Sequence, residues 1–538
     1  MPERRESLAR GGLTSLVGSA VAALAALALA VVLGNGAGAE GTGRFFQAVA
    51  VFTVITQALK LGTNSAIVRV VAEQRAVGAR GELWRTALVA VLPVLVASAL
   101  TGLAVWLAAE QLAGALGGDG RLAELLRILA PYLVIAAAMG VLHTVTRMVN
   151  GVAAFTLLQS VLLPLARLGA VLAALALGLG SQTAVAAWLA PVPLVLLVTI
   201  ALLVRPLLRD WRERRAARGS TGAHAREFWR FSSARGVGAA LETAAEWADV
   251  LLVAAIASPA AAGVYAVVTR SVRAGQVVDR AMRIAVAPRI STLLALGDVA
   301  EASRLHTAVT RVMILMAWPF YLGLAVFAPA VLAVFGPEFA AGAGVLAVIA
   351  VAAMVQSSTG MLQSVLLQGG HASWQLGNKA AALAVAVAAN LALLPLIGLW
   401  GAAIAWTAAM LVDLGLAAWQ VHRRMRVRLE PGRLLLPAAI PLVLVGGPGL
   451  LLGPLVGASP WRALLALAAL AVPYLLVLWL LRRRLGLDRV LHSLLGRRDR
   501  DTADGGGIPP EPSAPAAVGE DPADAPTKPP SALAARQG

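Results

Sequence analysis

Apolar runs of about 20 residues recur along most of this chain, and they restrict its fold more than any other feature. A helix of that length spans the ~30 Å hydrocarbon core of a bilayer. Of the 538 residues 59% are hydrophobic and only 14% are charged, a balance typical of membrane helices rather than of a water-soluble domain. The sequence therefore predicts an all-α polytopic membrane protein.

The apolar runs predict about fourteen transmembrane helices, and the charges between them indicate their orientation. Every second connection is rich in arginine, as at 205–230, whereas the opposite connections, such as 180–182, are short and nearly uncharged. Arginine-rich connections stay in the cytoplasm, so we expect both termini there. The predicted spans are 13–34, 45–68, 86–108, 125–147, 154–179, 183–204, 235–257, 261–287, 308–334, 340–367, 375–396, 398–420, 434–456 and 461–481.

Composition argues against several other classes of function. The net charge of +17 could suggest nucleic acid, but the basic residues fall in short clusters between apolar runs, so we expect no nucleic-acid partner. The chain has no cysteine and only six scattered histidines, which predicts no metal site, and we expect no cofactor. The predicted cytoplasmic connections contain no phosphate-binding P-loop, so ATP is not expected to drive the protein directly.

The sequence contains a candidate internal repeat. A shift of 220 residues places Gly43 on Gly263, and the same shift places Lys60 on Arg280. Chance similarity among alanine-rich helices is the alternative. Two six-helix copies in one orientation would enclose a central cavity around an axis along the membrane normal. The predicted organisation is a first six-helix lobe (1–210), a basic cytoplasmic linker (211–230), a second six-helix lobe (231–425), two extra transmembrane helices (426–481), a basic amphipathic juxtamembrane segment (482–498) and a disordered cytoplasmic tail (499–538).

Three acidic residues, Glu242, Glu246 and Asp249, lie within the predicted span 235–257. Their spacing puts them on one helical face, within about 60° of arc. Charges at membrane depth are costly and persist where they face a bundle interior, a water-filled cavity or an opposite charge. We therefore interpret them as part of a transport pathway, where they could bind a proton or Na⁺. The alternative is that they only neutralise arginines of the next helix.

Basic residues also lie at membrane depth, most of them on the predicted span 261–287. Arginine binds phosphate bidentately and keeps its charge in a poor dielectric, so these residues predict a cavity for an anion such as phosphate or pyrophosphate. The alternative is pairing with the acids. The five candidates are Arg270, Arg273, Arg280, Lys60 and Arg167. Lys379 and Asp413 lie near predicted cytoplasmic ends, where we expect solvated side chains.

Several blocks of the sequence resemble those of bacterial polysaccharide flippases, which belong to the multidrug/oligosaccharidyl-lipid/polysaccharide exporter superfamily. The blocks lie in both predicted copies and keep the order and spacing of that family, over roughly residues 5 to 425. They include Gly38–Phe45, Leu61–Ala66, Ala262–Tyr265, Phe335–Phe339 and Leu394–Ala403.

The resemblance implies a two-lobed flippase, not an enzyme, in the bacterial cytoplasmic (inner) membrane. Its cargo would be an undecaprenyl-pyrophosphate-linked oligosaccharide, carried by alternating access, with a polysaccharide polymerase or glycosyltransferases as further partners. Pyrophosphate would meet the arginines of the eighth predicted span. Lys60 and Arg167 would support them from the first lobe.

Three alternatives remain open. A cation-coupled multidrug or small-molecule antiporter would share the fold, but its cavity should not carry a basic excess. A lipid II flippase is less expected because the stretch Gly43–Gln47 departs from the early acidic-aromatic motif of that group. A membrane glycosyl polymerase would normally need a substantial external loop, and the external connections here are among the shortest.

Overall fold

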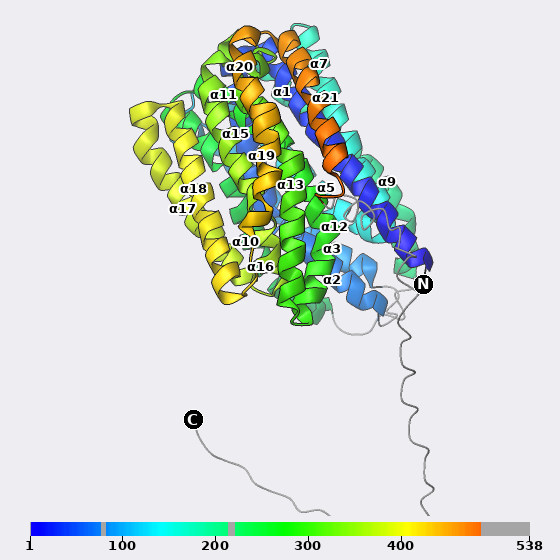
Figure 1. Cartoon of the computed structure of the whole chain (residues 1–538). Coiled ribbons are helices and arrows are strands. Elements are labelled where there is room, and N and C mark those ends of the chain that lie inside the picture. Colours follow the sequence, from blue (N-terminus) through cyan, green and yellow to red (C-terminus); the bar gives the residue numbers. More distant parts are fainter. Residues whose placement is uncertain (1, 77–81, 213–220, 486–538) are drawn as a thin grey trace, which may run out of the picture. The chain divides into compact units, whose positions relative to one another are not determined.

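The computed structural model describes residues 2–76, 82–212 and 221–485, and every regular element in these ranges is helical (Figure 1). The prediction of an all-α chain is therefore confirmed. The described residues belong to one compact unit, Met1–Leu487. The predicted tail 499–538, most of the juxtamembrane segment 482–498 and residues 213–220 of the predicted linker lie outside the described residues.

The first half of the chain contributes helices α1 to α9. Their bounds are α1 Pro2–Leu59, α2 Thr63–Ala76, α3 Leu83–Leu107, α4 Ala109–Ala115, α5 Gly120–Val149, α6 Gly151–Thr156, α7 Leu163–Ala176, α8 Gly180–Leu189 and α9 Pro191–Arg212, with a π-helical stretch Leu157–Leu162 before α7.

The second half contributes helices α10 to α21. Their bounds are α10 Thr221–Ile256, α11 Pro259–Ala274, α12 Val277–Ala295, α13 Val299–Val326, α14 Ala328–Ala333, α15 Ala343–Ser358, α16 Leu362–Gln368, α17 Ala372–Ile397, α18 Leu399–Trp419, α19 Leu435–Pro441, α20 Gly447–Val456 and α21 Pro460–Leu481, with short 3₁₀ helices at Pro337–Gly342 and Pro431–Arg433 and π-helical stretches at Gln420–Arg424 and Leu442–Gly446.

Eleven segments of the described chain are long and apolar enough to cross a membrane, so this is a multi-span membrane protein. The difference from about fourteen predicted spans has three sources. The segment Thr14–Ala76 runs continuously through two predicted spans. Helix α10 carries three acids within its apolar part. The eighth predicted span is divided into α11 and α12 at Gly275 and Gln276.

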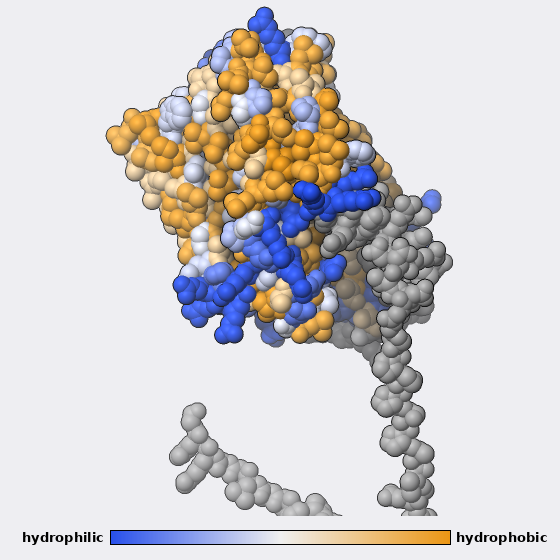
Figure 2. All heavy atoms as spheres, in the orientation of Figure 1, coloured by the Kyte–Doolittle hydropathy of each residue, from blue (hydrophilic) through white to orange (hydrophobic). Residues whose placement is uncertain are grey.

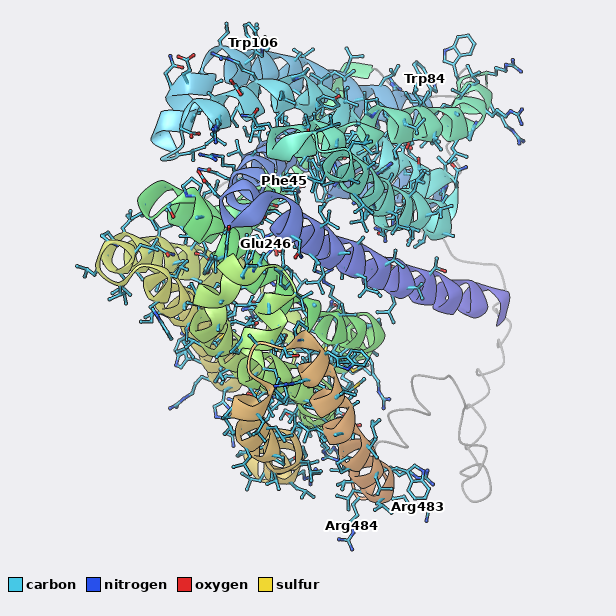
Figure 3. The ribbon with its side chains drawn as sticks, turned by 90° about the horizontal axis from the view of Figure 1, so that it is seen from above. Phe45, Trp84, Trp106, Glu246, Arg483 and Arg484 are labelled. Carbon is cyan, nitrogen blue, oxygen red and sulfur yellow. The ribbon has the colours of Figure 1, made fainter. Side chains whose placement is uncertain are left out.

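Helix α1 changes direction at Gly38, where the backbone has φ 66° and ψ −175°. A positive φ with that ψ is accessible essentially only to glycine. The break divides α1 into two parts. Helix α1 lies between the two halves of the chain and contacts α5, α7 and α8 of the first half and α10 and α11 of the second half (Figure 3).

Small side chains allow these helices to pack closely. Ala30, Ala48 and Ala266 are fully buried in the main core, together with large residues such as Phe45 and Tyr265. Without a hydrophobic driving force between helices in lipid, close packing of small residues is a main source of helix association. A separate core cluster joins α13 to α19, α20 and α21.

The outer surface is strongly apolar, as expected for helices that face lipid. Large side chains such as Leu100, Leu107 and Leu451 are more than half exposed. Figure 2 shows apolar residues over most of one face, whereas hydrophilic residues gather over its lower part, toward the end where α2, α12 and α16 lie in Figure 1. An exposed apolar belt above a hydrophilic end indicates a membrane boundary on this face.

Candidate functional site

A polar cavity of about 480 Å³ lies mainly within the second half of the chain. Its wall comes from α10, α11, α15, α17 and α18, and α1 contributes Gln57. Its size falls within the ~300–1,000 Å³ range of small-molecule sites. The lining residues with polar or charged side chains, apart from Trp406, are Gln57, Glu242, Thr243, Glu246, Asp249, Thr269, Arg273, Gln276, Gln356, Lys379 and Asp413.

Helix α10 brings Glu242, Glu246 and Asp249 to this cavity, as their spacing on one helical face predicts. They differ in exposure, because Asp249 is buried whereas Glu242 and Glu246 are exposed to the cavity side. The amide of Asn390 on α17 donates to the Asp249 carboxylate at 3.1 Å. Asp249 thus links α10 to α17. Glu246, on the same helix, lies close to α1 in Figure 3.

Arg273 at the end of α11 is the only one of the five predicted anion-binding residues among the residues that line this cavity. Its Nη1 lies 3.6 Å from Glu246 Oε1, and its Nη2 donates to the Glu246 carbonyl at 2.7 Å. Its side chain is 36% exposed, so it is not fully enclosed by the protein. An arginine in this position can bind a phosphate group bidentately.

Three of the other bases are held at separate places by aromatic rings or amides. The guanidinium of Arg270 lies 3.5 Å from the ring centroid of Phe46 on α1. That of Arg167 lies 3.6 Å from the ring centroid of Trp188, and Lys60 Nζ donates to Gln57 Oε1 at 3.3 Å. Cation–π contacts of this kind stabilise a charge where water is scarce.

Arg280 is exposed on α12 and lines neither of the two polar cavities of the second half. The prediction assumes a continuous helix from 261 to 287, but the helical hydrogen-bond pattern is interrupted at Gly275 and Gln276, between α11 and α12. The structure therefore does not bring the five predicted bases together on one face.

Lys379 and Asp413 form an ion pair that the sequence prediction missed. Lys379 Nζ lies 2.7 Å from Asp413 Oδ2, and the amide of Gln363 donates to Asp413 Oδ1 at 2.9 Å. Asp413 is 5% exposed, so the expectation of a solvated side chain is wrong for this residue. The signal that could have found the pair is one lysine and one aspartate within consecutive apolar spans, since such residues persist when paired.

A second cavity of about 210 Å³ adjoins the first. Both are lined by Gln276, Gln356, Lys379 and Asp413, so the ion pair lies at their junction. The smaller cavity also contacts Asp279 and Arg283 of α12 and residues of α16. A polar path therefore runs from the acids of α10 toward the end of the unit where α12 and α16 lie.

The charge balance of the main cavity is the reverse of the expected basic excess. Its lining has four carboxylates, Glu242, Glu246, Asp249 and Asp413, and two bases, Arg273 and Lys379. The reason lies in the contacts above, because Arg270 and Arg167 face aromatic rings rather than this cavity. Carboxylates in excess favour a proton, a metal cation or a cationic group as an additional occupant.

The chain matches a known family and a known fold. The family model described as "Polysaccharide biosynthesis protein" matches residues 8–294, more than half of the chain. A search of curated proteins finds no match.

Among solved structures, MurJ, a lipid II flippase in an inward closed conformation, matches with a TM-score of 0.69 and 10% identity, over 88% of this chain and 99% of that one. An inward-facing multidrug resistance MATE family transporter of the MOP superfamily matches with a TM-score of 0.60 and 17% identity, over 78% and 98%. A MOP superfamily transporter from Pyrococcus furiosus, whose title names a reversed polarity of the binding pocket, has a TM-score of 0.54 and 18% identity, over 78% and 95%.

At these identities the three structures show a shared fold. The family match is independent of them, and together they confirm the resemblance that the sequence blocks indicate. The chain belongs to the polysaccharide biosynthesis protein family and has the fold of MOP superfamily transporters.

Proposed function

We propose that this protein is a flippase that translocates an undecaprenyl-pyrophosphate-linked oligosaccharide across the bacterial cytoplasmic membrane, for the synthesis of a cell-surface polysaccharide. The observation that carries the proposal is the polysaccharide biosynthesis family match over residues 8–294 in a chain with a transporter fold. The polar cavity supports it, because hydroxyl-rich sugars need hydrogen-bonding groups inside a membrane. A polysaccharide polymerase or glycosyltransferases would act before or after this step.

We further propose fourteen membrane crossings with both termini in the cytoplasm. Eleven candidate spans become fourteen when Thr14–Ala76 is divided at Gly38 and when α10 and the α11–α12 pair are each counted as a crossing. Two six-helix lobes, 1–210 and 231–425, would then be followed by two extra helices within 426–481. The arginine-rich connections support this orientation.

In the proposed mechanism the two lobes rock about the path between them and open it alternately to each side. Arg273 makes the first contact with the pyrophosphate, since it lines the cavity. The other four predicted bases would join it only after the lobes move, because none of them lines the cavity in this conformation. These are Arg270, Arg280, Lys60 and Arg167. No covalent step is required of the protein.

Glu242, Glu246 and Asp249 are proposed to couple transport to a proton or Na⁺. Their position in the same cavity as Arg273 supports this role, because a cation bound there would change how firmly Arg273 is held. Transport by purified protein should then respond to a pH or sodium gradient. Insensitivity to both gradients, together with a fully active Glu246→Gln variant, would remove the coupling role.

Depletion of the protein in its host tests the proposed cargo. Radiolabelled lipid-linked oligosaccharide should accumulate on the cytoplasmic leaflet, and a surface polysaccharide should be lost. Analysis of the accumulated lipid would also separate this cargo from lipid II, which stays an alternative because a lipid II flippase shares the fold. Unchanged lipid-linked pools and intact surface polymers would contradict the proposal.

A cation-coupled antiporter of small molecules is the second candidate function. The observation that favours it is the surplus of carboxylates in the cavity, four against two bases, since an anionic cavity attracts cationic compounds. Expression in a drug-sensitive host is the direct test. Increased resistance to cationic dyes that is lost in Asp249→Asn would favour the antiporter over the flippase.

A further inference from the structure

The two halves of the chain meet backbone to backbone where α1 crosses α11. A Cβ atom on Gly43 would lie 1.7 Å from the carbonyl oxygen of Pro259, and one on Gly263 would lie 2.0 Å from the carbonyl oxygen of Ala39. Any side chain at either position would force the two helices apart. The same two glycines correspond to each other in the predicted repeat, so the crossing lies where a two-fold axis relating the copies would pass.

Two further close contacts flank this crossing, one on each side. A Cβ on Gly34 of α1 would lie 2.3 Å from the carbonyl oxygen of Phe335, beyond α14. A Cβ on Gly117, after α4, would lie 2.4 Å from the carbonyl oxygen of Ala255 at the end of α10. The first joins the part of α1 just before its break to a connection in the second half, and the second joins the end of α10 to a connection in the first half. The arrangement therefore repeats between the halves.

Glu338 adds a side-chain bond to this set of contacts. Because α1 breaks at Gly38, the N–H of Ala39 does not continue the helical hydrogen-bond pattern, and it donates to Glu338 Oε2 at 2.6 Å. The Asn35 amide, one helical turn earlier, donates to the carbonyl of Val334 at 2.8 Å. Ala39 and Glu338 belong to the sequence blocks Gly38–Phe45 and Phe335–Phe339. Neither block lines the cavity described above.

The position of Glu338 suits a bond that opens and closes. Glu338 is exposed, whereas Ala39 is 4% exposed. Water could therefore reach the N–H of Ala39 and replace the carboxylate only once the two halves separate. A backbone N–H left without an acceptor in a buried place is costly. The bond therefore favours the closed arrangement without making separation impossible.

A second junction between the halves lies roughly 25 Å further along α1. There the Ser232 hydroxyl donates to the carbonyl of Leu61 at 2.6 Å, and a Cβ on Gly62 would lie 2.1 Å from the Ser232 carbonyl oxygen. The halves thus touch at two levels, and transport between them requires the two junctions to part at different times.

We propose that Glu338 is the gate residue of the junction around Gly43, and that its bond to Ala39 holds this side of the path closed. In the proposed orientation this side faces away from the cytoplasm. The inference rests on the transport cycle proposed above but not on the identity of the cargo. Glu338 lines neither of the two cavities described above, so it would act on the protein's conformation rather than on the ligand.

The absence of native cysteine allows a direct test with the full chain in membranes. Ala39→Cys would serve as the reporter, labelled from outside with a membrane-impermeant maleimide. Adding Glu338→Ala should raise the labelling rate at least about fivefold, the factor that one hydrogen bond of ordinary net strength represents. Glu338→Gln keeps an acceptor oxygen, so it should raise the rate less.

Glu40→Gln is the matched control, because Glu40 lies next to the same break but pairs with Arg44 within α1. Its labelling rate should equal that of the reporter alone. Equal rates for Glu338→Ala and the reporter, or equal increases for Glu338→Ala and Glu40→Gln, would overturn the proposal. If Glu338→Ala is not recovered folded, a rate in Glu338→Gln no higher than in the reporter would overturn it instead. Because labelling needs no cargo, a failed flippase assay and a failed gate are distinguishable.

Discussion

Asp413 is a residue whose surroundings explain why it tolerates burial. It is 5% exposed, and both carboxylate oxygens are occupied, one by Lys379 at 2.7 Å and the other by Gln363 at 2.9 Å. A buried charge is tolerated when it is paired and hydrogen-bonded. The pair adjoins both cavities, so it lies between the cavity that the acids of α10 line and the one that α12 and α16 line.

Lys379→Ala should destabilise the protein, because it leaves the buried Asp413 carboxylate without its partner charge. We expect a loss of about 1–3 kcal/mol in the free energy of unfolding, below the value for fully buried pairs because the Lys379 side chain is 38% exposed. Thermal unfolding of detergent-solubilised protein measures the loss. Arg304→Ala breaks the exposed Arg304–Glu301 pair and should change stability by less than ~0.5 kcal/mol. Equal losses in the two variants would contradict this account of Asp413.

Arg273→Ala should abolish transport while leaving membrane insertion intact, because Arg273 is the predicted phosphate-binding residue in the cavity. Loss of a bidentate charged contact corresponds to roughly 10- to 100-fold in affinity. Arg304→Ala removes an equal charge from an exposed position on α13, away from the cavity lining, and should retain most activity. The flipping rates of both variants in membrane vesicles test whether transport depends on Arg273. Normal transport by Arg273→Ala would rule out its role as a phosphate ligand.

At the scale of single elements, sequence periodicity predicted some placements and could not predict others. The shared face of Glu242, Glu246 and Asp249 was predictable, because it needs only the geometry of one uninterrupted helix. The exposure of Arg280 was not, because the turn at Gly275 and Gln276 interrupts an apolar span without a proline. The pairing of Lys379 with Asp413 depends on how α17 packs against α18, which no single segment encodes.

The crossing of α1 and α11 leads to a prediction about glycine. Gly43→Ala should destabilise the protein by about 1–3 kcal/mol, the usual cost of overpacking, because the new methyl group would overlap the Pro259 carbonyl. Gly169→Ala is a matched control within helix α7, where nothing lies within 4 Å of the added Cβ. It should be neutral or stabilising, since alanine favours helix over glycine by up to ~1 kcal/mol. If Gly169→Ala unfolds at a lower temperature than Gly43→Ala, the crossing is not tightly packed.

At the scale of the whole molecule, the halves of the chain differ in what they provide. The second half supplies almost the whole cavity wall, and the first half supplies Gln57 and the α1 segment that contacts both halves. The predicted repeat suggested a central cavity between the two lobes. In this conformation the halves touch closely at Gly43 and Gly62, and the cavity lies mainly in the second half. A sequence repeat constrains the fold of each copy, but it does not determine which conformation of the cycle is observed.

Flipping by the purified protein is the measurement that tests the central claim most directly. The full chain would be reconstituted into liposomes with a fluorescent undecaprenyl-pyrophosphate-linked oligosaccharide, and the fraction in each leaflet would be followed with an impermeant glycan-modifying reagent. We expect exchange between leaflets with the unaltered protein and none with Arg273→Ala or with protein-free liposomes. No exchange with the unaltered protein, in liposomes where it does export a cationic dye, would contradict the flippase account and favour the antiporter.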